Sequence, residues 1–259
     1  MALFYFCYIY YMEWKNFINK RNKINGLDLL SYIPDDTLTV VFFDPQYRGV
    51  LDKLSYGNEG KSRGKDRCDL TQMPEEIIKK FFTLIERKLK PDGYLFLWVD
   101  KFHLVTGILP WFEHTPSLSP VDLITWNKKK IGMGYRTRRI CEYLIVLQKT
   151  PRHDKATWTI HNIPDVWDEK ITNKIHTHQK PIELQKQLLL ATTKEGDLVC
   201  DPASGSYSVF KCCKLIGRDF IGGDIEFGDN KDIPMSELEM YMTDEKKNEV
   251  LEPVENSLF

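Results

Sequence analysis

The stretch LTVVFFDPQY, residues 38–47, decides the fold. Its first six residues are almost all apolar, β-branched or aromatic, a pattern typical of a strand that is buried on both faces of a parallel sheet. Asp44-Pro45 then ends the strand, because proline lacks a backbone N–H and restricts the residue before it. The stretch therefore predicts a central strand with a carboxylate at its carboxyl end.

Strands and helices alternate along the rest of the chain. Strands are predicted at residues 94–99, 121–126, 143–147, 198–200 and 220–221. Helices are predicted from periodic apolar residues at 75–89, 182–192 and 209–216. This alternation predicts an α/β fold, a doubly wound and mostly parallel sheet whose ligands bind at the carboxyl ends of the strands. We expect the chemistry in the loops after Phe43, Val99, Cys200 and Ile221, and we expect Asp44 and Asp201 to meet across neighbouring strand ends.

The composition is that of a globular protein. The chain has 259 residues, 42% of them hydrophobic, and 36 basic against 37 acidic residues give a net charge of −1. These values exclude disorder and collagen-like repeats, and any affinity for a polyanion must come from a local basic patch. The six cysteines form no Cys-x-x-Cys pair, so no metal site is predicted and reduced thiols in the cytoplasm are expected.

Both ends of the chain and two polar stretches fall outside the α/β pattern. Residues 1–11 are apolar but too short to span a membrane. They are expected either to add a strand or, if Met12 is the natural start, to come from upstream sequence. The folded domain is expected at 12–228, with long loops near 48–73 and 128–177, and a peripheral acidic tail at 229–259.

Two motifs follow predicted strands. In Asp44-Pro45-Gln46-Tyr47 a carboxylate, a backbone carbonyl and an aromatic ring are combined, which suits a planar amine: the two oxygens accept its N–H groups and the ring stacks on it. The alternative is a simple turn. The second motif, residues 201–206 (DPASGS), opens a helix, and Asp224 ends the next strand, where an acid can accept ribose hydroxyls. Without a lysine at the turn, a neutral or cationic nucleoside is favoured over a triphosphate.

Four motifs in this order resemble the β-class amino-methyltransferases of DNA. They are Asp44-Pro45-Gln46-Tyr47 (family form Asp-Pro-Pro-Tyr), His178-Gln179-Lys180-Pro181, the 201–206 turn, and Phe220-Ile221-Gly222-Gly223-Asp224. The resemblance covers residues 24–225 and implies a Rossmann-like fold in permuted motif order, with S-adenosylmethionine as cofactor. Gln46 departs from the family pattern, as does Tyr207, which stands where glycine is frequent and puts the contact to the methionine part of the cofactor in question.

The resemblance also implies residue roles. The catalytic residues it implies are Asp44, Pro45, Gln46 and Tyr47. The cofactor-binding residues it implies are Asp28, Asp44, Lys180, Asp201, Pro202, Ala203, Gly205, Ser206 and Asp224. Three structural alternatives stay open: Asp28 as a helix cap, Asp224 as a turn cap, and Lys180 as a solvated cation.

Basic residues are concentrated in two segments, six of them within residues 128–139 and four within 61–67. Double-stranded DNA is the expected partner. The DNA-binding residues expected are Arg48, Lys130, Arg136, Arg138 and Arg139. The alternative is an ordinary solvated face.

The resemblance implies methylation of a base flipped out of DNA. It favours adenine N6 over cytosine N4, because aspartate leads the tetrapeptide where serine is commoner in the cytosine-N4 members of the family. Alternatives are cytosine-N4 methylation, methylation of an RNA or protein amino group, and a silent nucleic-acid-binding relative. A paired restriction endonuclease is a candidate partner.

Overall fold

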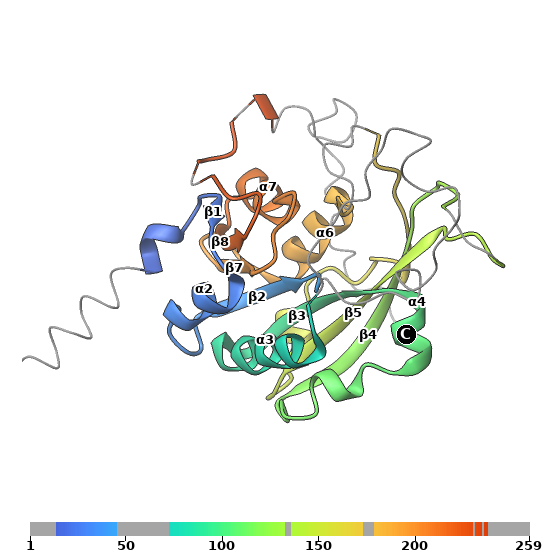
Figure 1. Cartoon of the computed structure of the whole chain (residues 1–259), viewed down its shortest axis with the longest axis horizontal. Coiled ribbons are helices and arrows are strands. Elements are labelled where there is room, and N and C mark those ends of the chain that lie inside the picture. The colour runs from blue at the N-terminus through green and yellow to red at the C-terminus, as the bar shows by residue number, and fades with distance from the viewer. Residues whose placement is uncertain are drawn as a thin grey trace, which may run out of the picture.

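The computed structural model describes residues 14–45, 73–132, 136–172, 179–229, 231–234 and 236–237. These residues build an eight-stranded sheet in the order β1-β8-β7-β2-β3-β5-β4-β6 (Figure 1). Its strands are β1 (Asn22–Lys23), β2 (Leu38–Phe43), β3 (Leu89–Val99), β4 (Leu118–Asn127), β5 (Cys141–Lys149), β6 (Val166–Asp168), β7 (Leu198–Asp201) and β8 (Asp219–Asp224).

Helices connect these strands and cover the sheet. The α-helices are α2 (Gly26–Tyr32), α3 (Glu75–Lys88), α4 (Lys101–Thr106), α5 (Asp154–Thr157), α6 (Ile182–Thr192) and α7 (Ser208–Leu215), with short 3-10 helices η1 (Trp14–Phe17) and η3 (Leu109–Trp111). Among the described residues, no helix is long and apolar enough to cross a bilayer.

The sheet is mostly parallel. From β1 to β3 every neighbouring pair of strands runs parallel. β5 is antiparallel to both β3 and β4, and β6 is parallel to β4. The predicted fold class is therefore confirmed. Because β5 is reversed, its first residues lie beside the carboxyl end of β3, with Tyr143 opposite Val99.

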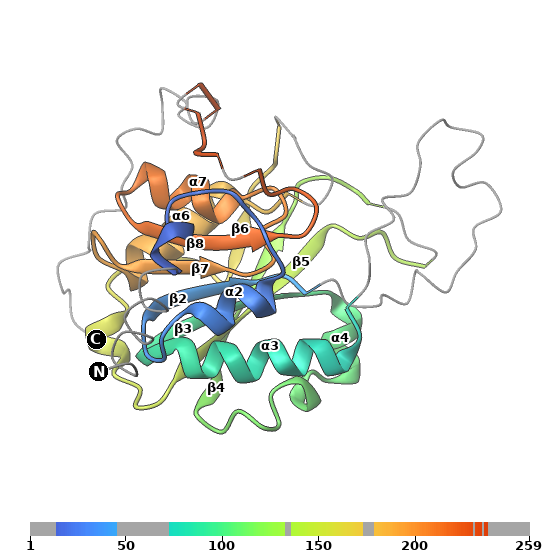
Figure 2. The same cartoon turned by 60° about the vertical axis from the view of Figure 1, so that its left-hand side comes forward.

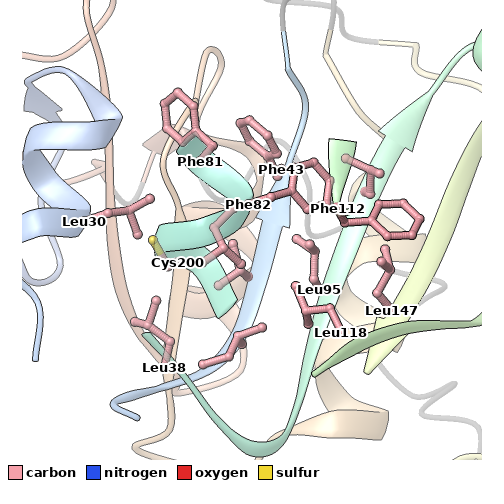
Figure 3. Packing of buried hydrophobic residues seen from close by; sticks show 14 of the residues in the cluster. Leu30, Leu38, Phe43, Phe81, Phe82, Leu95, Phe112, Leu118, Leu147 and Cys200 are labelled. Carbon is pink, nitrogen blue, oxygen red and sulfur yellow. The ribbon is translucent and has the colours of Figure 1, made fainter. Parts of the chain in front are cut away.

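Both faces of the central strands β2, β3 and β7 are buried. Side chains of β2 alternate between two cores: Val41 and Phe43 pack under α2 and α3, whereas Val40 and Phe42 pack under α6 and α7. Figure 2 shows the two helix pairs on opposite sides of the strands. In the first core, Phe43 lies against Phe81 of α3, with ring centroids 4.9 Å apart (Figure 3). This alternation explains the uninterrupted apolar run of the strand.

The predicted elements are confirmed with shifted bounds. β2 and α6 have the predicted limits, whereas β3 begins at Leu89 instead of residue 94, and β4 and β5 are longer than expected at both ends. The polar stretch 150–177 contains only α5 and β6 as regular elements among its described residues.

The ends of the chain are described only in part. Residues 1–11 and the loop at 48–72 lie outside the described residues. Of the acidic tail, the described part packs against the domain, since Ile233 is 1% exposed and Glu237 pairs with the buried Lys211 of α7 at 2.7 Å.

Candidate active site

The carboxyl ends of β2 and β7 lie side by side. Val41 of β2 is paired with Cys200 of β7 in a parallel register. Asp201 is the last residue of β7, and Asp44 follows β2 directly. The charge of Asp44 acts on Asp201, so the two carboxyl groups belong to one site. Two motifs that are far apart in the sequence thus meet at adjacent strand ends, as predicted.

The turn after β7 is held by hydrogen bonds within the turn and to β8, and by the close approach of β8 and α2. Ser204 donates its backbone N–H to the Gly223 carbonyl at 3.0 Å, and its hydroxyl to the Asp201 carbonyl at 2.6 Å. A side chain at Gly222 would put its Cβ 2.6 Å from the Asp201 carbonyl oxygen, and one at Gly26 would put it 2.1 Å from the Pro202 carbonyl oxygen. Glycine is therefore required where β8 and α2 approach this turn.

Asp224 joins β8 to the same turn. Its Oδ2 accepts the Gly205 N–H at 3.0 Å, and its Oδ1 accepts the N–H groups of Glu226 and Phe227 at 2.8 and 3.1 Å. The alternative of a turn cap is thus confirmed as one role of this carboxylate. Its predicted role toward a ribose remains a prediction.

Asp28 lies in the first turn of α2 and is exposed. It does not cap the helix, because the N-cap is Asn25, whose Oδ1 accepts the Leu27 N–H at 2.9 Å. The capping alternative for Asp28 is therefore wrong. The contact of Gly26 with the Pro202 carbonyl places the start of α2, and so Asp28, near the 201–206 turn.

Tyr207 adopts the left-handed backbone conformation that glycine favours, with φ 56°. Its ring is buried against Phe220, and its hydroxyl donates to the Asn22 carbonyl at 2.9 Å. The side chain therefore packs into the interior between α7 and β1. The departure from the family pattern is accommodated at the cost of backbone strain.

Lys180 lies at the centre of a charged cluster. Its Nζ is 3.0 Å from Asp44 Oδ2, 2.9 Å from Glu142 Oε2 and 4.8 Å from the centroid of the Trp98 ring. Only 13% of its side chain is exposed. The solvated-cation alternative is therefore wrong, because Lys180 contacts the carboxylate predicted to be catalytic, Glu142 of β5 and Trp98 of β3.

Burial and neighbouring charges shift the pKa values in this cluster. Burial, with the nearby charges of Asp44 and Asp224, raises the pKa of Asp201 to about 8. Burial alone would raise the pKa of Glu142, but the charges of Lys180 and Lys128 lower it to about 2. The three charged carboxylates Asp44, Asp224 and Glu142 outnumber the two ammonium groups of Lys180 and Lys128, which makes the site favourable for a cationic ligand.

The predicted DNA-binding residues separate into two groups. Lys130, Arg136 and Arg138 are exposed, and no described residue forms an ion pair with them. The Arg139 guanidinium instead lies 5.3 Å from the centroid of the Phe102 ring, and its Nη2 is 3.9 Å from Asp100 Oδ2. Phe102 and Asp100 thus fix the end of the 128–139 segment to α4 and its N-cap. Gln46, Tyr47 and Arg48 lie outside the described residues, as do His178 and the basic segment 61–67.

Sequence reasoning missed Glu142 and Trp98. The available signal was a lone acid in the otherwise apolar start of β5, CEYLIV. This signal becomes informative only once β5 is known to be antiparallel, because that direction brings Glu142 to the end of the sheet where β2 and β3 end and Asp44 lies.

Comparisons with known proteins agree with this geometry. Residues 38–229 match a family model described as DNA methylase. The Type II methyltransferase M.HhaII of Haemophilus parahaemolyticus is 65% identical over 221 residues, 85% of this chain and 97% of the relative. The Type II methyltransferase M2.DpnII of Streptococcus pneumoniae is 26% identical over 82% of this chain and 88% of the relative.

Two solved structures share the fold. The PvuII DNA methyltransferase (cytosine-N4-specific) has a TM-score of 0.61 at 15% identity, over 85% of this chain and 89% of that one. The M1.HpyAVI–SAM complex has a TM-score of 0.54 at 18% identity, over 80% of this chain and 93% of that one. At such low identity, these similarities establish the fold alone.

Proposed function

The chain belongs to the N6/N4 family of DNA methylases and is an S-adenosylmethionine-dependent DNA amino-methyltransferase, and we propose that its target is the N6 amino group of adenine in double-stranded DNA. The observation that carries this proposal is the position of Asp44. An aspartate heads the tetrapeptide after β2, and it lies beside the 201–206 turn at the neighbouring strand end.

The proposed mechanism follows from the chemistry of an aromatic amine. The nitrogen lone pair is delocalised into the ring, so the amine is a poor nucleophile. Asp44 and the Pro45 carbonyl accept its two hydrogens and favour a pyramidal nitrogen with a directed lone pair. The methylated nitrogen is then acidic enough to lose its proton without a strong base. Catalysis in this proposal is mainly orientation and electrostatics.

The donor set fits the cofactor. S-adenosylmethionine supplies an electrophilic methyl group on a positively charged sulfur. Asp44 and Asp224 supply negative charge beside the Gly205 turn, and Gly205 has no side chain to block a close approach. We assign the cofactor contacts to Asp28, Asp44, the turn residues Asp201, Pro202, Ala203, Gly205 and Ser206, and Asp224.

DNA is held, in this proposal, by the exposed cations Lys130, Arg136 and Arg138. The target base must leave the duplex to reach Asp44, because its amine is paired inside the helix. Tyr47 is proposed to stack on the extruded base. The similarity to Type II methyltransferases also makes a cognate restriction endonuclease the expected partner.

The test is methyl transfer from tritiated S-adenosylmethionine to unmethylated genomic DNA, followed by digestion and identification of the modified base. We expect N6-methyladenine with the wild-type chain. We expect no transfer with Asp44→Ala, which should still bind the cofactor through the remaining contacts of the 201–206 turn, Asp28 and Asp224. N4-methylcytosine would overturn the assignment to adenine, label found only in RNA or protein would overturn the assignment to DNA, and wild-type turnover by Asp44→Ala would overturn the role of Asp44.

A further inference from the structure

Glu142 connects the proposed catalytic carboxylate, through Lys180, to Lys128 at the start of the 128–139 segment. Its Oε1 is 3.0 Å from Lys128 Nζ, and its Oε2 is 2.9 Å from Lys180 Nζ. Lys180 in turn contacts Asp44 Oδ2 at 3.0 Å. The resulting chain of alternating charges, Lys128–Glu142–Lys180–Asp44, joins the end of β4, the start of β5, the segment before α6 and the end of β2.

This arrangement fixes the ammonium group of Lys180. A lysine ammonium is a point charge on a flexible stem and does not by itself orient a carboxylate. Here Glu142 holds it from β5, while the Trp98 ring of β3 contacts it at 4.8 Å, within the range of a cation–π interaction. With its position fixed by these two groups, the ammonium holds Asp44 Oδ2 in one direction.

We propose that Glu142 is a positioning residue for methyl transfer, which acts through Lys180 to fix the orientation of the Asp44 carboxylate. The inference rests on the proposed function, in which Asp44 accepts the hydrogens of the target amine. Methyl transfer that is catalysed mainly by orienting the substrate is sensitive to small displacements of the groups that hold it. Glu142 itself does not touch Asp44, so its effect must pass through Lys180.

The electrostatics of the chain support this role. Burial alone would lower the pKa of Lys180, but Asp44 of the β2 end and Glu142 of β5 raise it above its usual range. Asp201 of β7 also interacts with Lys180, and Lys128 at the end of β4 faces Glu142. Without the charge of Glu142, burial of Lys180 is opposed mainly by Asp44, and the pKa of Lys180 falls.

The test compares Glu142→Gln with Glu183→Gln in the full chain. Glu183 is a matched control because it also pairs with a lysine, Lys186, at 2.6 Å, but on α6. With saturating DNA and cofactor, we expect Glu142→Gln to lower kcat about tenfold or more while KM for DNA and the Kd for S-adenosylmethionine change less than about threefold. We also expect kcat of this variant to fall at a lower alkaline pH than that of the wild type. Glu183→Gln should retain wild-type values.

Three outcomes overturn the inference. They are a wild-type kcat and pH profile for Glu142→Gln, a fall in kcat with an unmoved alkaline limb, and an equal effect of Glu183→Gln. If Glu142→Gln does not fold, Glu142→Asp keeps the charge with a shorter reach. It should lower kcat with a wild-type alkaline limb, and a wild-type kcat would overturn the inference. Failure of the proposed function is distinct, since then the wild-type chain itself would not methylate DNA.

Discussion

Asp201 is a buried carboxyl group that is easier to protonate in the folded chain than in water. Burial and the charges of Asp44 and Asp224 raise its pKa to about 8 from 3.8. The folded state therefore binds more protons than the unfolded state between these two pH values. The stability of the protein without ligand must decline as the pH rises through this interval, because ionised Asp201 is unfavourable in the fold.

Asp201→Asn tests this linkage. We expect the variant to gain stability over the wild type by about 2–3 kcal/mol more at pH 8.5 than at pH 5.5, since each pKa unit corresponds to about 1.4 kcal/mol. Urea unfolding at both pH values measures it. The exposed Asp232→Asn is the control and should show no such difference. An equal effect of Asp201→Asn at both pH values would contradict the raised pKa.

At the scale of elements, α6 begins without a cap from its own N-terminal residue. Its N-cap is Pro181, which makes no side-chain hydrogen bond. Glu169, beyond β6, supplies the cap: its Oε1 accepts the Glu183 N–H at 3.1 Å, and its Oε2 accepts the Leu184 N–H at 3.0 Å. A carboxylate at this end also interacts favourably with the helix dipole. The polar stretch after β5 thus stabilises the helix that follows Lys180.

Glu169→Ala should lower the free energy of unfolding by about 1–2 kcal/mol, the usual cost of losing a helix cap. Chemical denaturation of the variant measures this loss. Glu113→Ala, which removes an exposed glutamate, should change the stability by less than about 0.5 kcal/mol. Wild-type stability of Glu169→Ala would show that the cap contributes nothing.

The elements differ in how far sequence could predict them. β2 and α6 were predicted to the residue, because an apolar run and a periodic stripe are local signals. α4 and β6 were not predicted, because α4 depends on the Asp100 cap and β6 on pairing with β4. Asp44 and Asp201 were predicted to meet, since parallel strands share one carboxyl edge. Glu142 was not, because its place depends on the reversed direction of β5.

At the scale of the whole molecule, the net charge of −1 conceals an uneven distribution. Several cations of the 128–139 segment are paired with acids: Lys128 with Glu142, Lys129 with Asp168, and Arg139 with Asp100. The exposed Lys130, Arg136 and Arg138 are the cations in this segment best placed to meet phosphates. Binding of DNA through them should therefore weaken strongly as salt increases.

Arg136→Ala/Arg138→Ala should weaken DNA binding and flatten the dependence of log K on log salt concentration by up to about two units, because each phosphate contact contributes about 0.9. Fluorescence anisotropy at several salt concentrations measures the slope. The control, Arg152→Ala/Lys155→Ala, also removes two positive charges. These residues follow β5, at the end of the sheet opposite to the carboxyl ends of β2 and β3. An unchanged slope in the first variant, or an equal change in the control, would contradict a phosphate-binding role.

The two-residue strand β1 matters more than its length suggests. It covers β8, pairing Lys23 with Asp224, and the Asn22 side chain donates to the Gly222 carbonyl at 2.8 Å. A truncated chain that lacked this strand would leave the backbone of β8 uncovered, ready to recruit a strand from another molecule. Shortened forms prepared for crystallisation or fusion should therefore keep the chain from Trp14 onward, because an uncovered β8 favours aggregation.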